Sequence, residues 1–447
     1  MNAGLRGGNP FLEGPILPPL IRFSLPLILS LLLQGLYGAV DLAVVGRFAA
    51  TSSTAAVAVG SQMMMTATTV LTGLTMGVTV LVGKAAGAES WEDAGRVVAG
   101  QIRLFAAAAV LLTAVVVAPA PVYTGWMNVP ADAVEETVAY LRICGAGMVF
   151  VAAYNGISGV FRGLGNSRIP LLFVTIACAI NVVLDLILVA GFRMDAAGAA
   201  LATVLAQAGS VLFSLLYLRR QPLPFRVGGR GGRMGAVGRI LRVGGPIALQ
   251  DTLVHVSFLM ITGIVNGLGL AASAGIGITE KLFAFLSMVL MAFLSALSAF
   301  VAQNMGAGQP RRARQAMAVA RRISSAVGAA IFLLTFFGGR LLAALFEDDP
   351  AVLTAAAAYF RGSAFEYLLT PTIYCFLGYF NGMEHTNFVM FQGLATAFLV
   401  RVPLSYLLST LPGAGMFTIS LAVPASALVS LLASVAYDRH LARTLRR

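Results

Sequence analysis

Apolar residues run through this chain in long continuous blocks, with neither the strict alternation of a surface strand nor the one-sided stripe of a surface helix. A helix needs about 20 apolar residues to cross a hydrocarbon core of about 30 Å, and blocks of that length recur from end to end. No stretch between them is long and polar enough for a separate soluble domain. The pattern predicts an all-α polytopic membrane protein with twelve transmembrane helices. The predicted spans are 20–45, 57–82, 98–119, 137–161, 170–190, 197–218, 245–267, 274–302, 319–338, 356–381, 388–408 and 416–437.

The second half of the sequence repeats the first at a spacing of 219–220 residues. Three matches share this spacing: Arg22–Pro26 with Arg242–Pro246, Gly87-Ala88 with Gly306-Ala307, and Phe161–Gly163 with Phe380–Gly382. Six helices per half is an even number, so both halves enter the membrane in the same orientation. We therefore expect two six-helix lobes related by a pseudo-twofold axis along the membrane normal, with a central cleft between them. Residues 1–218 form the predicted N-terminal lobe, 219–244 a basic cytoplasmic linker, and 245–447 the C-terminal lobe.

Charge is scarce and unevenly placed. Only 11% of residues are charged, with 30 Lys and Arg against 18 Asp and Glu, whereas a soluble protein carries about 25%. Most cations fall in the loops on one side, which predicts that both termini and the linker are cytoplasmic. The net charge of +12 does not indicate nucleic acid, because no soluble basic face carries it. The expected location is a bacterial or archaeal inner membrane, whose lipid bilayer is the main partner.

No enzyme motif is found in the sequence. Cys144, Cys178 and Cys375 lie inside apolar blocks without CxxC spacing, so packing is their expected role. A phosphate-binding loop, a zinc-ligand spacing and a nucleophile motif are all lacking. The sequence therefore predicts neither an enzyme nor a cofactor.

Two acids lie inside the predicted N-terminal lobe at matched depth. Asp41 is 15 residues past Pro26 and Asp185 is 14 residues past Leu171, or about 22 and 21 Å along helices that both run outward. Thr203 reaches a similar level on a helix that runs inward, and Asn181 shares the face of Asp185 one turn earlier.

Two readings of this group stay open. Carboxylates, an amide and a hydroxyl could bind Na⁺, or two close carboxylates could hold an exchangeable proton. The alternative is that the acids only bond neighbouring helices. The corresponding positions in the second half are Ile261 and Leu404. The repeat architecture therefore does not itself require Asp41 and Asp185, which favours a functional role.

The predicted C-terminal lobe contains its own ionisable residues within the spans: Asp251, Glu280, Lys281, Glu366 and Arg401. Asp251 is read as a helix-end residue. Glu280, Glu366 and Arg401 could line a polar substrate surface, or the two acids could simply neutralise Lys281 and Arg401. The sequence favours neither.

Over nearly its whole length the chain resembles the multidrug and toxic compound extrusion (MATE) family, most closely its DinF-type prokaryotic branch. The residues that carry the resemblance are Pro26, Gln34, Asp41 and Gly46 in the first span, Gly87-Ala88, Phe161–Pro170, Asn181–Asp185, Gly198–Thr203 and Gln303–Ala307. One departure is Asn381–His385, where the family more often has Arg-Gly-x-Gly.

The resemblance implies export of diverse, often cationic organic compounds, driven by inward flow of H⁺ or Na⁺. By similarity, Asp41, Asn181, Asp185 and Thr203 form a cation site, and Na⁺ would be its metal. Asn155 is often grouped with these residues, although its expected depth lies nearer the cytoplasm. Pro26 matches a proline linked to bending of the first helix.

We therefore expect a monomeric, cation-coupled multidrug efflux antiporter that works by alternating access. Gln34, Glu280, Glu366 and Arg401 are its candidate substrate-cleft residues. The alternative within the same superfamily is a flippase for lipid-linked precursors, which should meet phosphates with cations where this chain offers mainly carboxylates. A third class, an intramembrane enzyme, is disfavoured by the missing catalytic motif.

Overall fold

The computed structural model describes residues 9–127, 129–228 and 233–444. These ranges are almost entirely helical, and no strand occurs in them. A bilayer demands this, since backbone groups in lipid must be satisfied within the segment that carries them. Residues 229–232 of the predicted basic linker lie outside the described residues.

The chain divides into two compact units. Unit 1 is formed by Met1–Gly14, Ile21–Ala248 and Ala302–Gly308. Unit 2 is formed by Pro15–Leu20, Leu249–Val301 and Gln309–Arg447. Two long helices, α9 (Arg233–Asn266) and α10 (Leu270–Gly306), contribute residues to both units.

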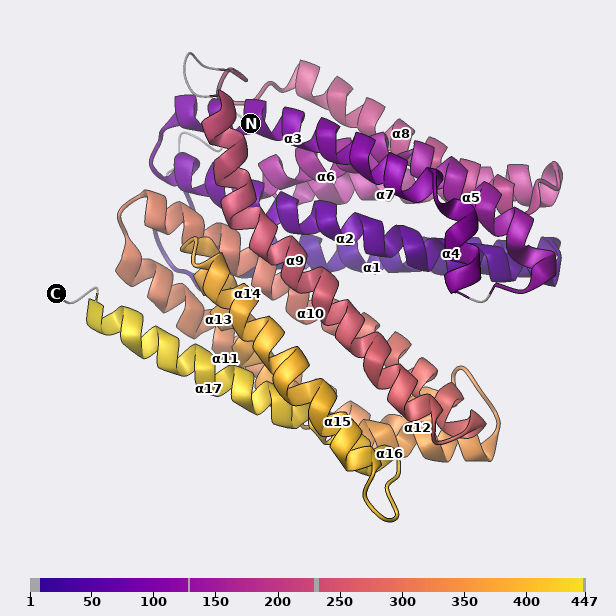
Figure 1. Cartoon of the computed structure of the whole chain (residues 1–447). Coiled ribbons are helices and arrows are strands. Elements are labelled where there is room, and N and C mark those ends of the chain that lie inside the picture. The colour runs from indigo at the N-terminus through magenta and orange to yellow at the C-terminus, as the bar shows by residue number, and fades with distance from the viewer. Residues whose placement is uncertain (1–8, 128, 229–232, 445–447) are drawn as a thin grey trace. The chain divides into compact units, whose positions relative to one another are not determined.

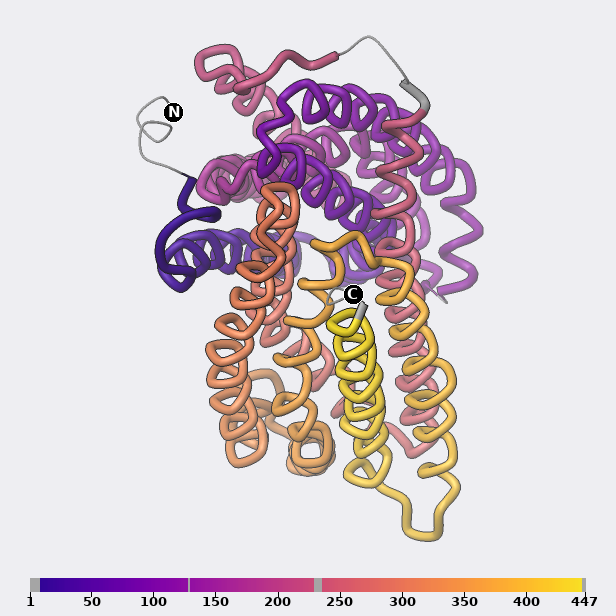
Figure 2. The backbone as a smooth tube through the Cα atoms, turned by 90° about the vertical axis from the view of Figure 1, so that its left-hand side faces the viewer, coloured from indigo at the N-terminus to yellow at the C-terminus, as the bar shows by residue number. Residues whose placement is uncertain are grey.

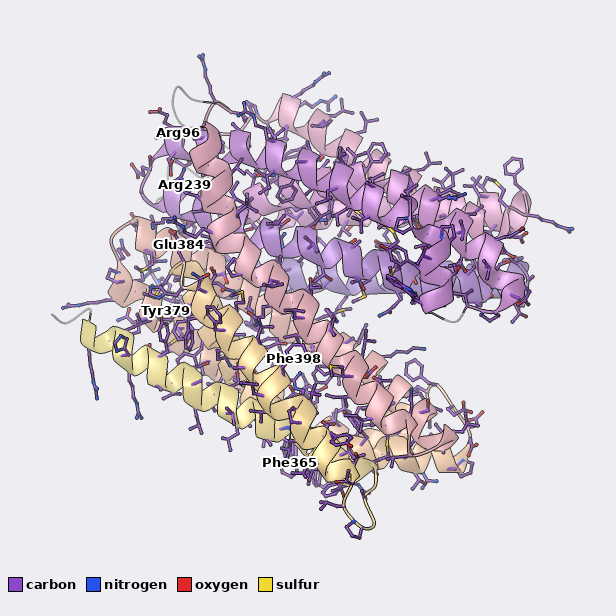
Figure 3. The ribbon with its side chains drawn as sticks, viewed as in Figure 1. Arg96, Arg239, Phe365, Tyr379, Glu384 and Phe398 are labelled. Atoms are coloured by element: carbon purple, nitrogen blue, oxygen red, sulfur yellow. The ribbon has the colours of Figure 1, made fainter. Side chains whose placement is uncertain are left out.

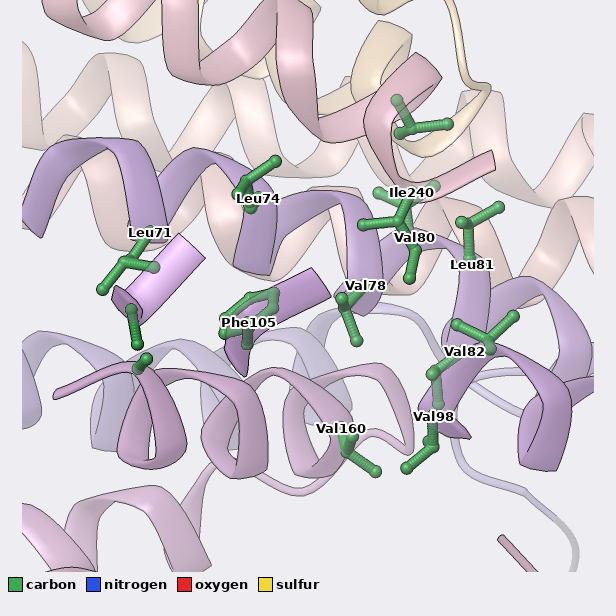
Figure 4. Close-up of a cluster of buried hydrophobic side chains, with 14 of the residues drawn as sticks. Leu71, Leu74, Val78, Val80, Leu81, Val82, Val98, Phe105, Val160 and Ile240 are labelled. Atoms are coloured by element: carbon green, nitrogen blue, oxygen red, sulfur yellow. The ribbon is translucent and has the colours of Figure 1, made fainter. Parts of the chain in front are cut away.

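Unit 1 is a bundle of long helices around α2 (Figure 1). In chain order its elements are α1 (Leu17–Phe48), α2 (Thr51–Gly87), α3 (Trp91–Val117), α4 (Ala120–Trp126), the 3₁₀ turn η1 (Ala131–Ala133), α5 (Val134–Ala146), α6 (Met148–Gly163), α7 (Arg168–Asp185), the π-helical turn η2 (Leu186–Gly191) and α8 (Asp195–Arg220). Leu71, Val78, Phe105, Val160 and Ile240 are fully or almost fully buried at its centre (Figure 4). The core therefore draws on α2, α3, α6 and the first part of α9.

Unit 2 is a second helical bundle, whose orange and yellow helices run side by side in Figure 2. Besides its parts of α9 and α10 it contains α11 (Pro310–Ala343), α12 (Pro350–Ser363), α13 (Glu366–Gly382), α14 (Thr386–Ala395), the π-helical turn η3 (Thr396–Arg401), α15 (Val402–Ser409), α16 (Met416–Ser420) and α17 (Ala422–Thr444). Helix α13 packs against α11 and α17. Its acidic first residue, Glu366, is thereby buried in this bundle.

Each of the twelve predicted spans falls on a helix or on helices joined end to end. In the described part of the chain, ten helices are long and apolar enough to cross a membrane. An eleventh span is formed by Ala131–Ala146 and Met148–Gly163, which are bent by 45° at Gly147. The span predicted at 356–381 likewise falls on two helices, α12 and α13, which are separated at Ala364-Phe365. The break makes Glu366 the first residue of α13.

Close approach of α2 and α9 holds the first part of α9 in unit 1. A Cβ atom on Gly73 would lie 2.4 Å from the Ala248 backbone, and one on Gly77 would lie 2.7 Å from Gly244 N. Both helices therefore cross through small residues four positions apart, as tightly packed membrane helices do. Near the start of α9, Arg239 donates two hydrogen bonds to Asp93, at 2.8 and 3.0 Å; Figure 3 labels Arg239 together with Arg96.

Candidate cation site in unit 1 and polar cluster in unit 2

The cation-site candidate begins on one face of α1. Gln34, Tyr37 and Asp41 are three and four positions apart, so their side chains leave the helix on the same side. Asp41 is only 4% exposed. Helix α1 therefore brings a carboxyl group into the interior of unit 1.

Helix α7 supplies the second carboxyl group. Asn181 and Asp185 are one turn apart and are 1% and 0% exposed. The α-helix ends at Asp185, and a π-helical turn follows at once. Such wider turns are frequent at functional sites, and this one begins directly after the acid.

Helix α8 completes the group with a hydroxyl. Thr203 Oγ1 donates a hydrogen bond to Asp41 Oδ2 at 3.2 Å. Asp185 and Asn181 are the other immediate polar neighbours of Asp41. The structure thus brings together the four residues that the sequence placed at one depth.

Several oxygen atoms of this group have no hydrogen-bond partner and could bind a cation. Asp41 Oδ1, both carboxyl oxygens of Asp185 and both polar atoms of Asn181 are buried without a hydrogen-bond partner. Two adjacent ionised carboxylates in such surroundings repel each other strongly, so a proton or a bound cation is needed to stabilise them. Oxygen atoms from carboxyl, amide and hydroxyl groups suit a hard cation such as Na⁺. In the described ranges, no group of three or more His, Cys, Asp or Glu side chains could hold a metal ion, so the site does not resemble a transition-metal centre.

Asn155 forms a hydrogen bond within its own helix and none with these four residues. Its amide Nδ2 donates to Val151 O of its own helix at 2.9 Å. That bond uses one of the two amide hydrogens within α6.

A small pocket beside the carboxyl pair includes residues that the sequence argument missed. It is lined by Tyr37, Ala177, Asn181, Thr203, Ala206 and Gln207. Tyr37 precedes Asp41 by one turn of α1, and this spacing was the available signal. Gln34, predicted as a substrate-cleft residue, lies in unit 1, with its Nε2 3.4 Å from Tyr154 Oη.

The polar cluster of unit 2 joins α9, α10 and the end of η3. Thr262 Oγ1 donates to Glu280 Oε1 at 2.6 Å. Arg401 Nε donates to Ser426 Oγ at 3.0 Å, and its guanidinium carbon lies 4.8 Å from the centre of the Phe258 ring. The guanidinium group is therefore held by a hydroxyl and an aromatic face.

Glu366 interacts electrostatically with Arg401 and has Thr370 as a side-chain neighbour, but forms no ion pair within 4.0 Å in the described residues. It is 4% exposed, and its Oε2 is buried without a hydrogen-bond partner. Within the part of the chain that the structure describes, no ion pair joins Glu280 or Glu366 to Lys281 or Arg401 within 4.0 Å. Lys281 is exposed.

Comparison with known proteins identifies the family. The MatE family model matches residues 26–187 and again 246–407, so the two halves, offset by 220 residues, are copies of one unit. A probable multidrug resistance protein of Bacillus subtilis, YpnP, is 26% identical over 431 residues, covering 96% of each chain. The multidrug export protein MepA of Staphylococcus aureus is 21% identical over 413 residues, covering 90% of this chain and 89% of MepA.

Solved structures show the same fold. A MOP superfamily transporter from Pyrococcus furiosus superposes with a TM-score of 0.92 at 19% identity, covering 98% of each chain. A MATE structure in complex with MaL6 gives a TM-score of 0.91 over the same shares. Together with the family match over both halves, these likenesses show that the chain is a membrane transporter of the multidrug and toxic compound extrusion (MatE) family.

Proposed function

We propose that this transporter is a cation-coupled antiporter that exports organic compounds while H⁺ or Na⁺ flows inward. One observation carries the proposal: Asp41 and Asp185 are adjacent and buried, and three of their four carboxyl oxygens have no hydrogen-bond partner. A pair of this kind is stable only when a cation or a proton is bound. Its occupancy can therefore change with the ion gradient.

Coupling follows from the strain of the empty pair. Loss of the ion restores the repulsion between the two carboxylates, and α1 can relieve it by moving Asp41 away from α7. Pro26 lies in the same helix, and its ring removes one backbone hydrogen bond and so eases bending there. If substrate and ion favour opposite conformations, each must weaken binding of the other, as linkage requires. This linkage produces exchange by alternating access.

The polar cluster of unit 2 fits an organic cation. Glu366 and Glu280 have no ion-pair partner among the described residues, and Phe258 and Tyr367 lie close by, with Phe283 between their rings. Carboxylates and aromatic faces both attract cations. The names of the relatives, which are multidrug resistance and export proteins, agree with a broad range of small-molecule substrates.

The orientation and the remaining partners follow from the sequence. The concentration of cations in alternate loops supports a topology with both termini in the cytoplasm, and we propose the inner membrane as the location. We propose that transport requires no cofactor besides the coupling ion. The proposed working form is a monomer. A lipid-linked precursor flippase would need several free cations to meet phosphate groups, whereas the polar cluster of unit 2 offers Arg401, whose Nε bonds Ser426 and whose Nη1 has no hydrogen-bond partner, beside the acids Glu280 and Glu366.

The test is transport by purified protein in liposomes. With a pH or Na⁺ gradient imposed, the protein should move a fluorescent organic cation against its concentration, and dissipating that gradient should stop the movement. Transport that ignores both gradients would refute the antiporter. Movement of a fluorescent lipid-linked phosphate without movement of the dye would establish the flippase instead.

A further inference from the structure

Gly87 and Gly306, which occupy equivalent positions in the sequence repeat, each pack against the helix backbone that carries the other. A Cβ atom on Gly87, at the end of α2, would lie 1.9 Å from Gln303 O. A Cβ atom on Gly306, at the end of α10, would lie 2.0 Å from Lys84 O. Gly87 and Gly306 are 219 residues apart, and so are Lys84 and Gln303. Equivalent helix ends from the two halves thus meet backbone to backbone within unit 1.

Two buried amide side chains fasten this contact to the rest of unit 1. Gln303 and Asn304 are 1% and 0% exposed. Gln303 Nε2 donates to Gly163 O at 2.8 Å, and Gln303 Oε1 accepts from Asn9 Nδ2 at 3.0 Å. Asn304 Nδ2 donates to Phe11 O at 3.1 Å. The end of α10 is therefore bonded both to the end of α6 and to the segment that precedes α1.

The segment before α1 is folded into place. Asn9 Oδ1 accepts from the backbone N–H of Phe11 at 3.0 Å, which forms a local turn. The Phe11 ring is buried, with its centre 5.3 Å from that of Phe23. A Cβ atom on Gly165 would lie 3.5 Å from the same ring.

The contacted elements lead directly to the cation site. Phe23 belongs to α1, which carries Asp41, and Gly165 precedes α7, which carries Asn181 and Asp185. A movement of α1 or α7 that follows loss of the ion would shift the surface on which Phe11 and Gln303 rest. The route is a series of contacts along α1 and α7.

We propose that Gln303 and Asn304 form a latch that holds this end of unit 1 closed and that opens once in every transport cycle. The latch comprises these two residues together with Asn9, Phe11 and Gly163. It deepens the proposed function and rests on it, because an antiporter must open each side in turn. Residues Ala302–Gly308 belong to unit 1, whereas the preceding part of α10 belongs to unit 2. Release of the latch therefore frees the end of a helix that is continuous with unit 2.

The chemistry of the latch suits repeated opening. Its side-chain bonds join amides to neutral acceptors, so water can replace each partner when the contact separates. The glycine contact adds close packing without an interlocking side chain. In the proposed orientation this end faces the cytoplasm, where water is at hand.

The decisive experiment locks the latch. Cysteines replace Asn9 and Gln303 in a variant whose three native cysteines are changed to alanine, and a short bifunctional thiol reagent with a reducible spacer joins them. Dye transport in liposomes should fall to the level of empty liposomes on cross-linking and return on reduction. Each single-cysteine variant treated in the same way is the control. A cross-linked protein that transports as fast as the uncross-linked one would overturn the latch.

A second arm separates failure of the latch from failure of the proposed function. Hydrogen–deuterium exchange is followed at residues 84–90 and 303–308 of the wild type, of Gly87→Ala and of the control Gly277→Ala, whose added Cβ meets nothing within 4 Å. We expect faster exchange in Gly87→Ala than in the wild type and Gly277→Ala, and slower exchange in the variant with cysteines at positions 9 and 303 after cross-linking than before it. If wild-type liposomes move no dye, the antiporter fails, and the exchange data still decide the latch: exchange that neither cross-linking nor Gly87→Ala alters overturns it.

A kinetic readout distinguishes a latch from simple packing. Gln303→Leu removes both side-chain hydrogen bonds, and Gln315→Leu, at an exposed position of α11, is the matched control. We expect Gln303→Leu to lower the maximal transport rate by about fivefold or more, as loss of a buried hydrogen bond allows, with the KM for the dye unchanged or lower. Equal losses in both variants, or a loss explained by reduced protein amount alone, would contradict the proposal.

Discussion

Thr203 on α8 donates its hydroxyl hydrogen to Asp41 on α1 at 3.2 Å, and so joins two helices at the cation site. This bond helps to stabilise the charged form of the Asp41 carboxyl group. Replacing Thr203 by Val keeps the shape but removes the donor. We expect Thr203→Val to change the apparent affinity for the coupling ion by about fivefold, the effect of one buried hydrogen bond. The change should weaken binding of Na⁺, which loses an oxygen ligand, and strengthen binding of H⁺, because the charged carboxylate loses a donor; Thr203→Ser should restore most of the wild-type affinity. The measurement is dye transport against ion concentration, and an unchanged ion dependence in Thr203→Val would show that the bond is incidental.

Asp41→Asn should abolish gradient-driven transport while the folded protein remains in the membrane. An amide cannot take up the exchangeable proton and is a weaker ligand for Na⁺, and the repulsion with Asp185 disappears in every state. Transport in liposomes and monodispersity in detergent are the paired measurements. Wild-type transport by Asp41→Asn under the same gradient would refute the proposed coupling.

Glu366→Gln should change which compounds are exported more than it changes ion coupling. The buried Glu366 carboxyl group lies in unit 2 without an ion-pair partner in the ranges described, so its negative charge is available to an organic cation. We expect transport of dicationic dyes to fall by about tenfold or more, the effect of a buried charge-assisted bond, and transport of neutral compounds to change little. Glu347→Gln, at an exposed position after α11, is the control. If every substrate is transported as before, Glu366 has a structural role only.

The folded protein should become less stable at acidic pH because His385 takes up a proton. This residue lies in the turn between α13 and α14. Burial lowers the pKa of His385 below its ordinary value of 6.5, and its Nδ1 lies 2.6 Å from Tyr437 Oη. The unfolded chain therefore takes up the proton more readily than the folded one, so the stability contributed by neutral His385 is present above the ordinary pKa and is lost below it. Between about pH 7.5 and pH 5 the midpoint of thermal unfolding should drop less in His385→Gln than in the wild type. Equal drops in both proteins would remove His385 as the cause.

The helical fold could be predicted from the sequence because spans and loops differ so strongly in composition. The breaks inside the helices were missed, since Ala364-Phe365 and Gly147 look like ordinary apolar positions and break only in the packed bundle. Helical rise predicted that Asp41, Asp185 and Thr203 lie at one depth, with Asn181 on the face of Asp185, and the family resemblance grouped the four into one site. Tyr37 and Gln207 were missed because periodicity gives the face of a residue but not which neighbouring helix it meets.

The latch was beyond sequence reasoning for a different reason. Gln303 and Asn304 were visible only as part of a motif, and their partners Asn9 and Phe11 lie almost 300 positions away in a segment without any pattern. Contacts between segments so distant in the chain arise from tertiary packing. Only coordinates reveal them.

The reciprocal contact at Gly87 and Gly306 also constrains how the two halves can diverge. If the protein arose by duplication of a six-helix ancestor, each copy has been free to lose residues that the other keeps, as at positions 261 and 404, where the second half has Ile and Leu. The paired glycines are different, because a methyl group on either one would meet a carbonyl oxygen of the other copy at about 2 Å. A mutation at one glycine is thus opposed by the backbone of the other half, which no side-chain change there can move aside. At these two positions the copies must be inherited as a matched pair.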